Sequence, residues 1–199
     1  MTDPHLPPEL QALIAEGADD VAVATKSTTP GERTRPEQLS RYLCRLVWAH
    51  DTGALANLRR PEALTEPRLV AANFSPEEEH RLAYEKVAFL FARFHAGRSR
   101  ALPGSGSMGR ALRRIGGPGG RGPKDPGATR LLDRLVASHE LPLRHLQHAI
   151  ERARACDVTP PSWARLADDL TKWRSPGESV AYDWARDFYT PVFRSKRND

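Results

Sequence analysis

Arginines spaced to share a helix face are the residues of this sequence that most clearly indicate a chemistry. Arg110, Arg113 and Arg114 stand at i, i+3 and i+4, and Arg130 and Arg134 stand four apart, so each set lies on one side of a helix. A guanidinium group binds a phosphate through paired hydrogen bonds. No aromatic residue lies among these arginines, which argues against base stacking there. The pattern favours sequence-independent contact with a nucleic-acid backbone.

The positive charge of the chain is concentrated in one segment. The 199 residues have a formal net charge of +5. Residues 98–150 contain ten basic and three acidic residues, a net charge of +7, and the rest of the chain has a net charge of −2. A concentrated basic surface attracts polyanions, of which nucleic acid is the commonest in a cytoplasm. A solvated surface without a partner is the alternative.

The segment 104–109 reads Gly-Ser-Gly-Ser-Met-Gly and matches the G-x-G-x-x-G fingerprint of dinucleotide-binding proteins. That fingerprint needs a β-strand before it and a βαβ unit around it, whereas here it follows a predicted helix end and Leu102-Pro103. No phosphate-binding Gly-Lys-Ser/Thr sequence is present. A nucleotide cofactor is therefore not expected.

Histidines and paired carboxylates were the other candidates for chemistry. His145 and His148 stand three apart with Glu151 nearby, but a zinc site needs further ligands, so we interpret them as half-buried or polyanion-facing histidines. The carboxylates of the last two predicted helices are expected to be solvated or paired with Arg165, Lys172 and Arg186; they are Asp168, Asp169, Asp183 and Asp187. No nucleophile, base and orienting group occur together. We expect no catalytic residue, metal or cofactor, and no enzyme.

The elements that position these residues are all predicted to be helices. Apolar residues recur at helical spacing in seven or eight segments, and period-two alternation is almost absent. Several starts are marked by capping residues: Pro36, Ser75-Pro76 with Glu78 as a capping box, Asp125-Pro126 and Ser162. Arg59 and Arg60 end a short helix that begins at Thr52, where the helix dipole favours cations. The fold class is all-α, a helical bundle.

The composition of the chain predicts two small packed helical subdomains. We expect a flexible arm over residues 1–35, an N-terminal helical subdomain over 36–115, a Gly/Pro-rich loop over 116–127, a C-terminal helical subdomain over 128–190 and a flexible basic tail over 191–199. The tryptophans, at helical spacing on apolar faces, are predicted core residues: Trp48, Trp163, Trp173 and Trp184.

Several protein classes are excluded by simple features of the sequence. No apolar run approaches the roughly 20 residues of a membrane span, and no basic segment followed by an apolar core marks a secretory signal. The two cysteines, Cys44 and Cys156, cannot form a disulfide framework and read as core or boundary residues. We expect a cytoplasmic protein without a membrane partner.

Three ordered segments and the tail resemble a known family. They are Thr52-Gly53-Ala54-Leu55-Ala56-Asn57-Leu58-Arg59-Arg60, Ser107-Met108-Gly109-Arg110-Ala111-Leu112, Trp163 through Leu166-Ala167-Asp168-Asp169-Leu170 to Trp173, and Trp184-Ala185-Arg186-Asp187-Phe188-Tyr189. Their order and spacing over residues 37–190 are similar to the CasB family, the small subunit of the type I-E CRISPR Cascade surveillance complex.

The resemblance implies a non-catalytic antiviral-defence protein with a basic surface. That surface would support the guide RNA–target DNA hybrid and hold the displaced single-stranded DNA, which stabilises the R-loop. The implied partners are these nucleic acids, other Cascade subunits and a second copy of the chain. The family's basic residues carry over to Arg59, Arg60, Arg110, Arg130 and Arg144, with His145 where the family can show a second basic residue.

The nucleic-acid-binding residues expected from spacing and resemblance together are Arg59, Arg60, Arg110, Arg113, Arg114, Arg130, Arg134, Arg144 and His145. Three other functions stay open at this point. The chain could act alone as a sequence-independent DNA- or RNA-binding protein, as a structural scaffold whose arginines meet acidic protein partners, or as a small helical enzyme that uses His145 and His148.

Overall fold

A computed structural model describes residues 34–60, 63–116, 121–173, 175, 177 and 179–190. These residues contain nine α-helices, two single-turn 3-10 helices and no strand, which confirms the predicted all-α class. The elements are α2 (Arg35–Trp48), α3 (Thr52–Leu58), α4 (Glu66–Asn73), η1 (Glu78–His80), α5 (Arg81–Phe94), α6 (Met108–Arg113), η2 (Gly122–Lys124), α7 (Pro126–Val136), α8 (Leu143–Ala155), α9 (Trp163–Thr171) and α10 (Val180–Tyr189). Apart from Thr34 and Arg35, the predicted arm over 1–35 and the tail over 191–199 lie outside the described residues.

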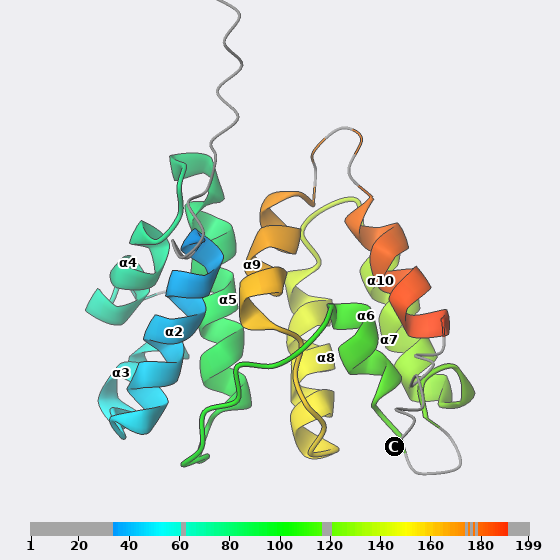
Figure 1. The fold of residues 1–199 in the computed structure, drawn as a ribbon, viewed down its shortest axis with the longest axis horizontal. Helices are drawn as coiled ribbons and strands as arrows, with labels where there is room; N and C mark the ends of the chain where they lie inside the picture. The colour runs from blue at the N-terminus through cyan, green and yellow to red at the C-terminus, as the bar shows by residue number, and fades with distance from the viewer. Residues whose placement is uncertain are drawn as a thin grey trace, which may run out of the picture. The chain divides into compact units, whose positions relative to one another are not determined.

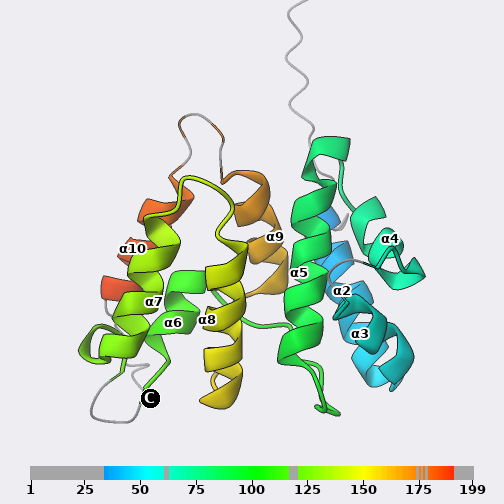
Figure 2. The ribbon, with the colours of Figure 1, turned by 180° about the vertical axis from the view of Figure 1, so that it is seen from behind.

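The described helices pack in two groups (Figures 1 and 2). Each group contains one helix from the other half of the chain. Helix α5 packs against α2, α3 and α4 on one side, and α10 packs against α6 and α7 on the other. Helix α9 follows α8 in the chain but packs against α2 and α5, whereas α6 precedes the Gly/Pro-rich segment but packs against α7, α8 and α10. Helices α5 and α8 are in contact across the groups.

This exchange bears on the predicted subdomains. The buried apolar residues of α2 through α10 form one hydrophobic cluster rather than two. A boundary drawn at residues 116–127 separates α6 from the helices it packs against, and it also separates α9 from its own neighbours. The division of the chain into subdomains stays a prediction.

Five helix starts are stabilised by a side chain that accepts a backbone N–H, and at α2 the Glu37 carboxylate accepts from Thr34 at 3.1 Å. Asp125 accepts from Ala128 at 2.8 Å and begins α7, and Ser162 accepts from Arg165 at 3.4 Å and begins α9, so both predicted starts are confirmed. Asp51 caps α3 in the same way at 2.8 Å, and Ser107 caps α6 at 3.3 Å.

The predicted start at Ser75 is wrong. The Ser75 hydroxyl donates to the carbonyl of Glu77 at 2.6 Å, and Glu78 pairs with Arg81 at 3.2 Å. Neither side chain then caps a helix at residue 76; a single 3-10 turn follows, and α5 begins at Arg81. Helix α4 was not predicted. Its described buried residues are the small Ala71 and Ala72, so the sequence shows no stripe of large apolar residues there.

The predicted core holds for three of the four tryptophans. Trp163 and Trp184 are completely buried, and Trp173 is half-buried against the core. Trp48 is 59% exposed, so its prediction as a core residue is wrong. The buried side of α2 is formed by Leu39, Leu43, Cys44 and Val47, and position 48 is a further 100° around the helix. Cys44 is buried and Cys156 half-buried, as predicted, and both are free thiols.

A buried histidine that the sequence analysis did not identify fastens the segment between α5 and α6. The Nδ1 of His95 donates to the Phe91 carbonyl at 2.9 Å, and its Nε2 accepts from the backbone N–H of Leu102 at 2.9 Å. Trp163 donates from Nε1 to the Leu102 carbonyl at 2.8 Å. Burial lowers the pKa of His95 to about 4, so the ring is neutral at physiological pH. The connection to α6 is thereby fixed to α5 and α9.

None of the described helices combines the length and the apolar character that crossing a membrane requires.

Candidate nucleic-acid interface

Helices α7 and α8 carry a row of exposed basic side chains on their outer sides. On α7 they are Arg130 and Arg134, opposite the buried Leu132 and Leu135; on α8 they are Arg144, His148 and Arg152, opposite the buried Leu146, Ala149, Ile150 and Ala153. We call these five basic residues the α7–α8 surface. Helices α7 and α8 lie side by side in both views (Figures 1 and 2).

The basic residues of α7 and those of α8 lie close to one another at both ends of the helix pair. A Cβ placed on Gly127 at the start of α7 would lie 3.9 Å from the Nη2 of Arg152 near the end of α8. Arg134 and Arg144 flank the short connection at the other end of the pair. Among the described residues, no ion pair or side-chain hydrogen bond involves Arg130, Arg134, Arg144 or Arg152. The exposed acid on α7 is Asp133, so positive charge predominates.

The arginines of α6 lie in a different environment. Arg113 donates to the Phe188 carbonyl, and Arg114 donates to the carbonyls of Ser105 and Thr159 at 3.0 and 3.2 Å. Burial, and then the charge of nearby Arg110, lowers the pKa of Arg114. Arg110 itself is exposed, with its Nε 3.6 Å from an oxygen of Asp187. Two of the three predicted α6 arginines therefore hold backbone carbonyls, and their role toward nucleic acid stays a prediction.

Arg59 and Arg60 lie apart from the other predicted site residues. Both follow α3, and α3 and α7 stand at opposite ends of the row of helices (Figures 1 and 2). Arg59 is half-buried and Arg60 is exposed. The fold therefore does not bring them to the α7–α8 surface.

Helix α8 carries one predicted binding residue, His145, that is not fully exposed, and two exposed basic residues, His148 and Arg152, that were not among the predicted binding residues. His145 is half-buried, and its Nδ1 is buried without a hydrogen-bond partner among the described residues. His148 and Arg152 follow Arg144 at i+4 and i+8 and are exposed. The i, i+4, i+8 spacing, applied to α8 as it was to α6 and α7, would have found both residues.

A buried carboxylate joins α6 to α10. Asp187 accepts a hydrogen bond from the Ser107 hydroxyl at 2.6 Å. Its same oxygen lies 3.6 Å from Arg110 and 3.6 Å from Arg165. The side chain is 10% exposed, so of the two expected environments, solvated or paired with an arginine such as Arg165, Asp187 has the paired one. Of the other predicted pairs, Asp168 binds Lys172 at 3.0 Å and Asp183 binds Arg186 at 2.8 Å.

The same two helices approach so closely that a side chain is excluded between them. A Cβ on Gly109 would lie 1.9 Å from the Trp184 carbonyl oxygen. Trp184 donates from Nε1 to Asp169 at 2.6 Å. Burial raises the pKa of Asp169 despite that hydrogen bond and the charge of Arg165. Three of the four segments that carry the family resemblance, on α6, α9 and α10, thus build this contact, and the carboxylates of Asp169 and Asp187 act in packing.

Among the described residues, the histidines of α8 belong to no group of three possible ligands within reach of one ion. Glu151 instead accepts hydrogen bonds from Arg93 and, at 3.1 Å, from Gln147. Although partial burial opposes the shift, these bonds lower the pKa of Glu151. The described part of the chain has one group of three possible ligands within reach of one ion, Glu77, Glu79 and His80, and it lies at η1. In the described chain the 104–109 segment is not preceded by a β-strand. It therefore lacks the strand that a dinucleotide-binding fingerprint needs.

Comparison with known proteins places these observations in a family. The family model for CRISPR-associated protein Cse2 matches residues 54–189. None of the curated proteins compared with the chain matches it.

Three solved structures share the fold. The crystal structure of CasB from Thermobifida fusca has 18% identity and a TM-score of 0.59, over 78% of this chain and 96% of that one. A CRISPR-associated protein of the Cse2 family from Thermus thermophilus has 24% identity and a TM-score of 0.58, over 79% and 99%. The structure of CasB from Thermus thermophilus gives the same values. The chain therefore belongs to the CRISPR-associated Cse2, or CasB, family, the small subunits of type I-E Cascade.

Proposed function

We propose that the α7–α8 surface binds nucleic-acid backbone inside the Cascade complex and so stabilises the R-loop. The observation that carries this proposal is the set of four exposed arginines on two neighbouring helices, none of them in an ion pair with another described residue. An unpaired guanidinium on a helix surface keeps its donors available for a phosphate. Because Arg130, Arg134, Arg144, His148 and Arg152 include no aromatic residue of the Phe, Tyr or Trp type, the surface itself offers no such ring on which a base could stack.

The energetics of target binding make such a surface useful. Formation of an R-loop exchanges one duplex for another of about equal stability, and contacts between protein and backbone tip the balance. Four arginine contacts to a single strand give a log–log salt slope of about −3. We propose that the ligand is the guide RNA–target DNA hybrid or the displaced DNA strand, and that the chain contributes no catalysis.

The remaining predicted residues have proposed roles that follow their surroundings. Arg110, exposed on α6, and Arg59 and Arg60, beyond α3, are proposed as further contacts on separate parts of the molecule. Arg113 and Arg114 are proposed to hold α6 in place. The proposed partners, in the cytoplasm, are the other Cascade subunits and a second copy of the chain.

The test is a salt titration with matched double variants. Arg130→Ala with Arg144→Ala removes one arginine from each helix of the α7–α8 surface. The control is Arg81→Ala with Arg186→Ala, which removes two exposed arginines that pair with acids at 3.2 and 2.8 Å. Each variant is assembled into the complex, and its affinity for target DNA is measured against salt concentration. We expect the first variant to make the slope shallower by about 1.4 for a single-stranded contact, equally for all target sequences, and the control to leave it unchanged.

Equal slopes in both variants would contradict the proposal. Binding of the free chain with a sequence or duplex preference would instead favour a protein that acts alone. Loss of complex assembly without loss of DNA contact would favour a scaffold whose arginines meet acidic protein partners.

A further inference from the structure

The exposed side of α2 presents an aromatic ring in line with two arginines. Trp48 is 59% exposed at the end of the helix. Arg41 and Arg45 are exposed at positions seven and three residues before it. Along the helix axis these spacings place Arg41 and Arg45 about 6 Å apart and Trp48 about 4.5 Å beyond. We call Arg41, Arg45 and Trp48 the α2 face.

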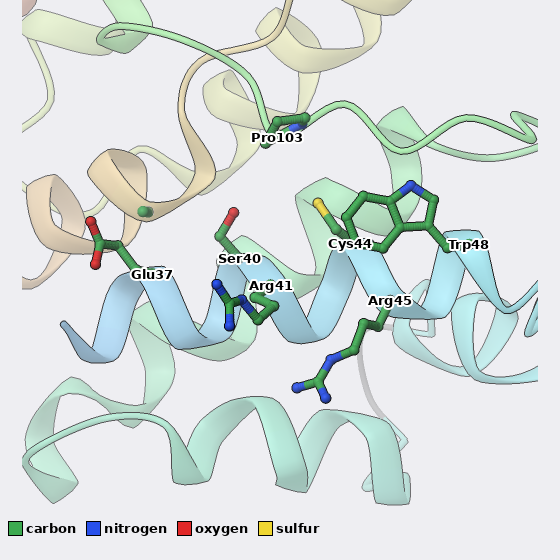
Figure 3. Close-up of a pocket in the computed structure, with 8 residues that line it drawn as sticks. Glu37, Ser40, Arg41, Cys44, Arg45, Trp48 and Pro103 are labelled. Atoms are coloured by element: carbon green, nitrogen blue, oxygen red, sulfur yellow. The ribbon is translucent and has the colours of Figure 1, made fainter. Parts of the chain in front are cut away.

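The α2 face borders a hollow of about 610 Å³. Figure 3 shows Cys44 and Trp48 pointing toward the segment that carries Pro103 and Arg45 pointing away from it, with Arg41 between Trp48 and Arg45 around the helix. Burial raises the pKa of the Cys44 thiol to about 11, so the thiol stays protonated and uncharged. The hollow thus has an apolar side next to a cationic one.

The charge of this region is positive. Among the described residues no ion pair involves Arg41 or Arg45. The acid that lines the hollow is Glu37, and its carboxylate accepts the backbone N–H of Thr34 at 3.1 Å, at the N-terminus of α2. A carboxylate held there is stabilised by the helix dipole. Both guanidinium groups remain available to an anionic ligand.

An exposed indole beside free arginines matches the requirements of single-stranded nucleic acid. Proteins that bind single strands combine cationic groups that follow the backbone with aromatic rings on which bases stack. A duplex covers the faces of its internal bases, so it offers the indole nothing to stack on. Tryptophan and arginine are also enriched in protein–protein interfaces, so the experiments below include a protein ligand as an outcome that would overturn the proposal.

We propose that the α2 face binds a single strand of nucleic acid, with a base stacked on Trp48 and backbone phosphates on Arg41 and Arg45. This site goes beyond the α7–α8 surface, because α2 and α7 lie at opposite ends of the row of helices (Figures 1 and 2). It does not depend on whether the α7–α8 surface binds.

The first test measures the stacking contact in the full chain. The probe is a fluorescently labelled oligothymidine of about 12 nucleotides, within the site size of single-strand binders. Trp48→Ala should weaken its binding at least about five-fold, the lower end of one base–aromatic contact. Trp48→Phe should restore most of the affinity. Tyr182→Ala, which removes a 64% exposed ring from α10, should leave the affinity unchanged.

Intrinsic fluorescence gives an independent readout when the natural chain is compared with Trp48→Phe, because Trp163 and Trp184 are completely buried and the half-buried Trp173 is present in both proteins. Oligothymidine should quench the indole emission of the natural chain, and Trp48→Phe should remove that quenching. Thermal unfolding of each variant checks that the helices are intact. Unchanged affinity and unchanged quenching in the Trp48 variants would overturn the proposal and assign the ring to a protein contact.

The second test separates the charge contacts from those of the other surface. Arg41→Ala with Arg45→Ala should make the salt slope for oligothymidine shallower by about 1.4. If this variant and Trp48→Ala have no effect while Arg130→Ala with Arg144→Ala does, the α2 face fails and the α7–α8 surface stands. The opposite result leaves the α2 face in place and excludes a single strand as the ligand of the α7–α8 surface, whose binding of the hybrid is tested in the assembled complex.

Discussion

Arginines of the same sequence spacing have opposite surroundings on the α7–α8 surface and in the contact between α6 and α10. On α7 and α8 the guanidinium groups are exposed and have no ion-pair partner among the described residues. On α6, Arg113 and Arg114 donate to backbone carbonyls of other segments. The i, i+3, i+4 pattern reports a shared helix face, but what that face meets depends on the partner helix. Arginines in the sequence therefore take part in packing between α6 and α10, whereas on α7 and α8 they form a surface available to a ligand.

The largest effect that would sharpen this comparison is expected at Gly109. Alanine there would place a Cβ 1.9 Å from the Trp184 carbonyl, so α6 and α10 must move apart. We expect a loss of about 3 kcal/mol or more in the free energy of unfolding, measured in urea. The control is Gly53→Ala, whose Cβ would meet its nearest atom at 3.6 Å and which should stabilise the chain by roughly 0.4–1 kcal/mol. Equal stabilities of the two variants would contradict the close approach.

The stability of the protein measured against pH tests whether the segment between α5 and α6, which His95 fastens, is as tightly packed as the α6–α10 contact. The pKa of His95 is about 4 in the folded chain against 6.5 for an ordinary histidine. As pH falls below 6.5 the unfolded chain binds the proton first, so stability is lost progressively down to about pH 4 and is unaffected above 6.5. The loss amounts to roughly 3 kcal/mol. His95→Gln should remove this part of the pH dependence; an identical slope of stability against pH in the variant would refute the assignment.

Paired arginine variants test the comparison directly. Arg114→Ala leaves the carbonyls of Ser105 and Thr159 without their donor, and we expect a loss of about 1–3 kcal/mol in stability. Arg130→Ala removes an exposed side chain and should change stability by less than about 0.5 kcal/mol. Calorimetry of both variants under one buffer condition is sufficient. Similar losses would show that the two regions do not differ as described.

The smallest effect is expected from Arg152, which the sequence analysis did not select. Arg152→Ala should leave stability within about 0.5 kcal/mol of the natural chain. In the assembled complex it should make the salt slope of target binding shallower by about 0.7 if the contact is with a single strand. An unchanged slope would confine the α7–α8 surface to Arg130, Arg134, Arg144 and His148.

The helices were largely predictable, because each has a local signal. Asp125 and Ser162 cap α7 and α9 as their positions predict, and the stripes ending at Leu135 and Leu170 are buried. Helix α4 was missed because its buried residues are small. The start at Ser75 failed because its hydroxyl bonds a turn carbonyl instead.

The site was predictable only in part, because exposure depends on distant segments. Arg130, Arg134 and Arg144 are exposed as a binding role requires, whereas the partners of Arg113 and Arg114 lie 75 and 45 residues away along the chain. Trp48 has the spacing of a core residue, but in the described part of the chain it is 59% exposed. Local spacing does not encode which face a later helix will cover.

The exchange of α6 and α9 between the two groups of helices has a consequence for the order of events during synthesis. Helix α2 leaves the ribosome early, yet its neighbour α9 is completed only at Thr171. At ordinary translation rates the interval is on the order of ten seconds. Throughout it, the apolar side of α2 that α9 will cover stays open to water. Apolar surface that is exposed in this way during synthesis is prone to aggregation, and here it is covered only once α9 has been made.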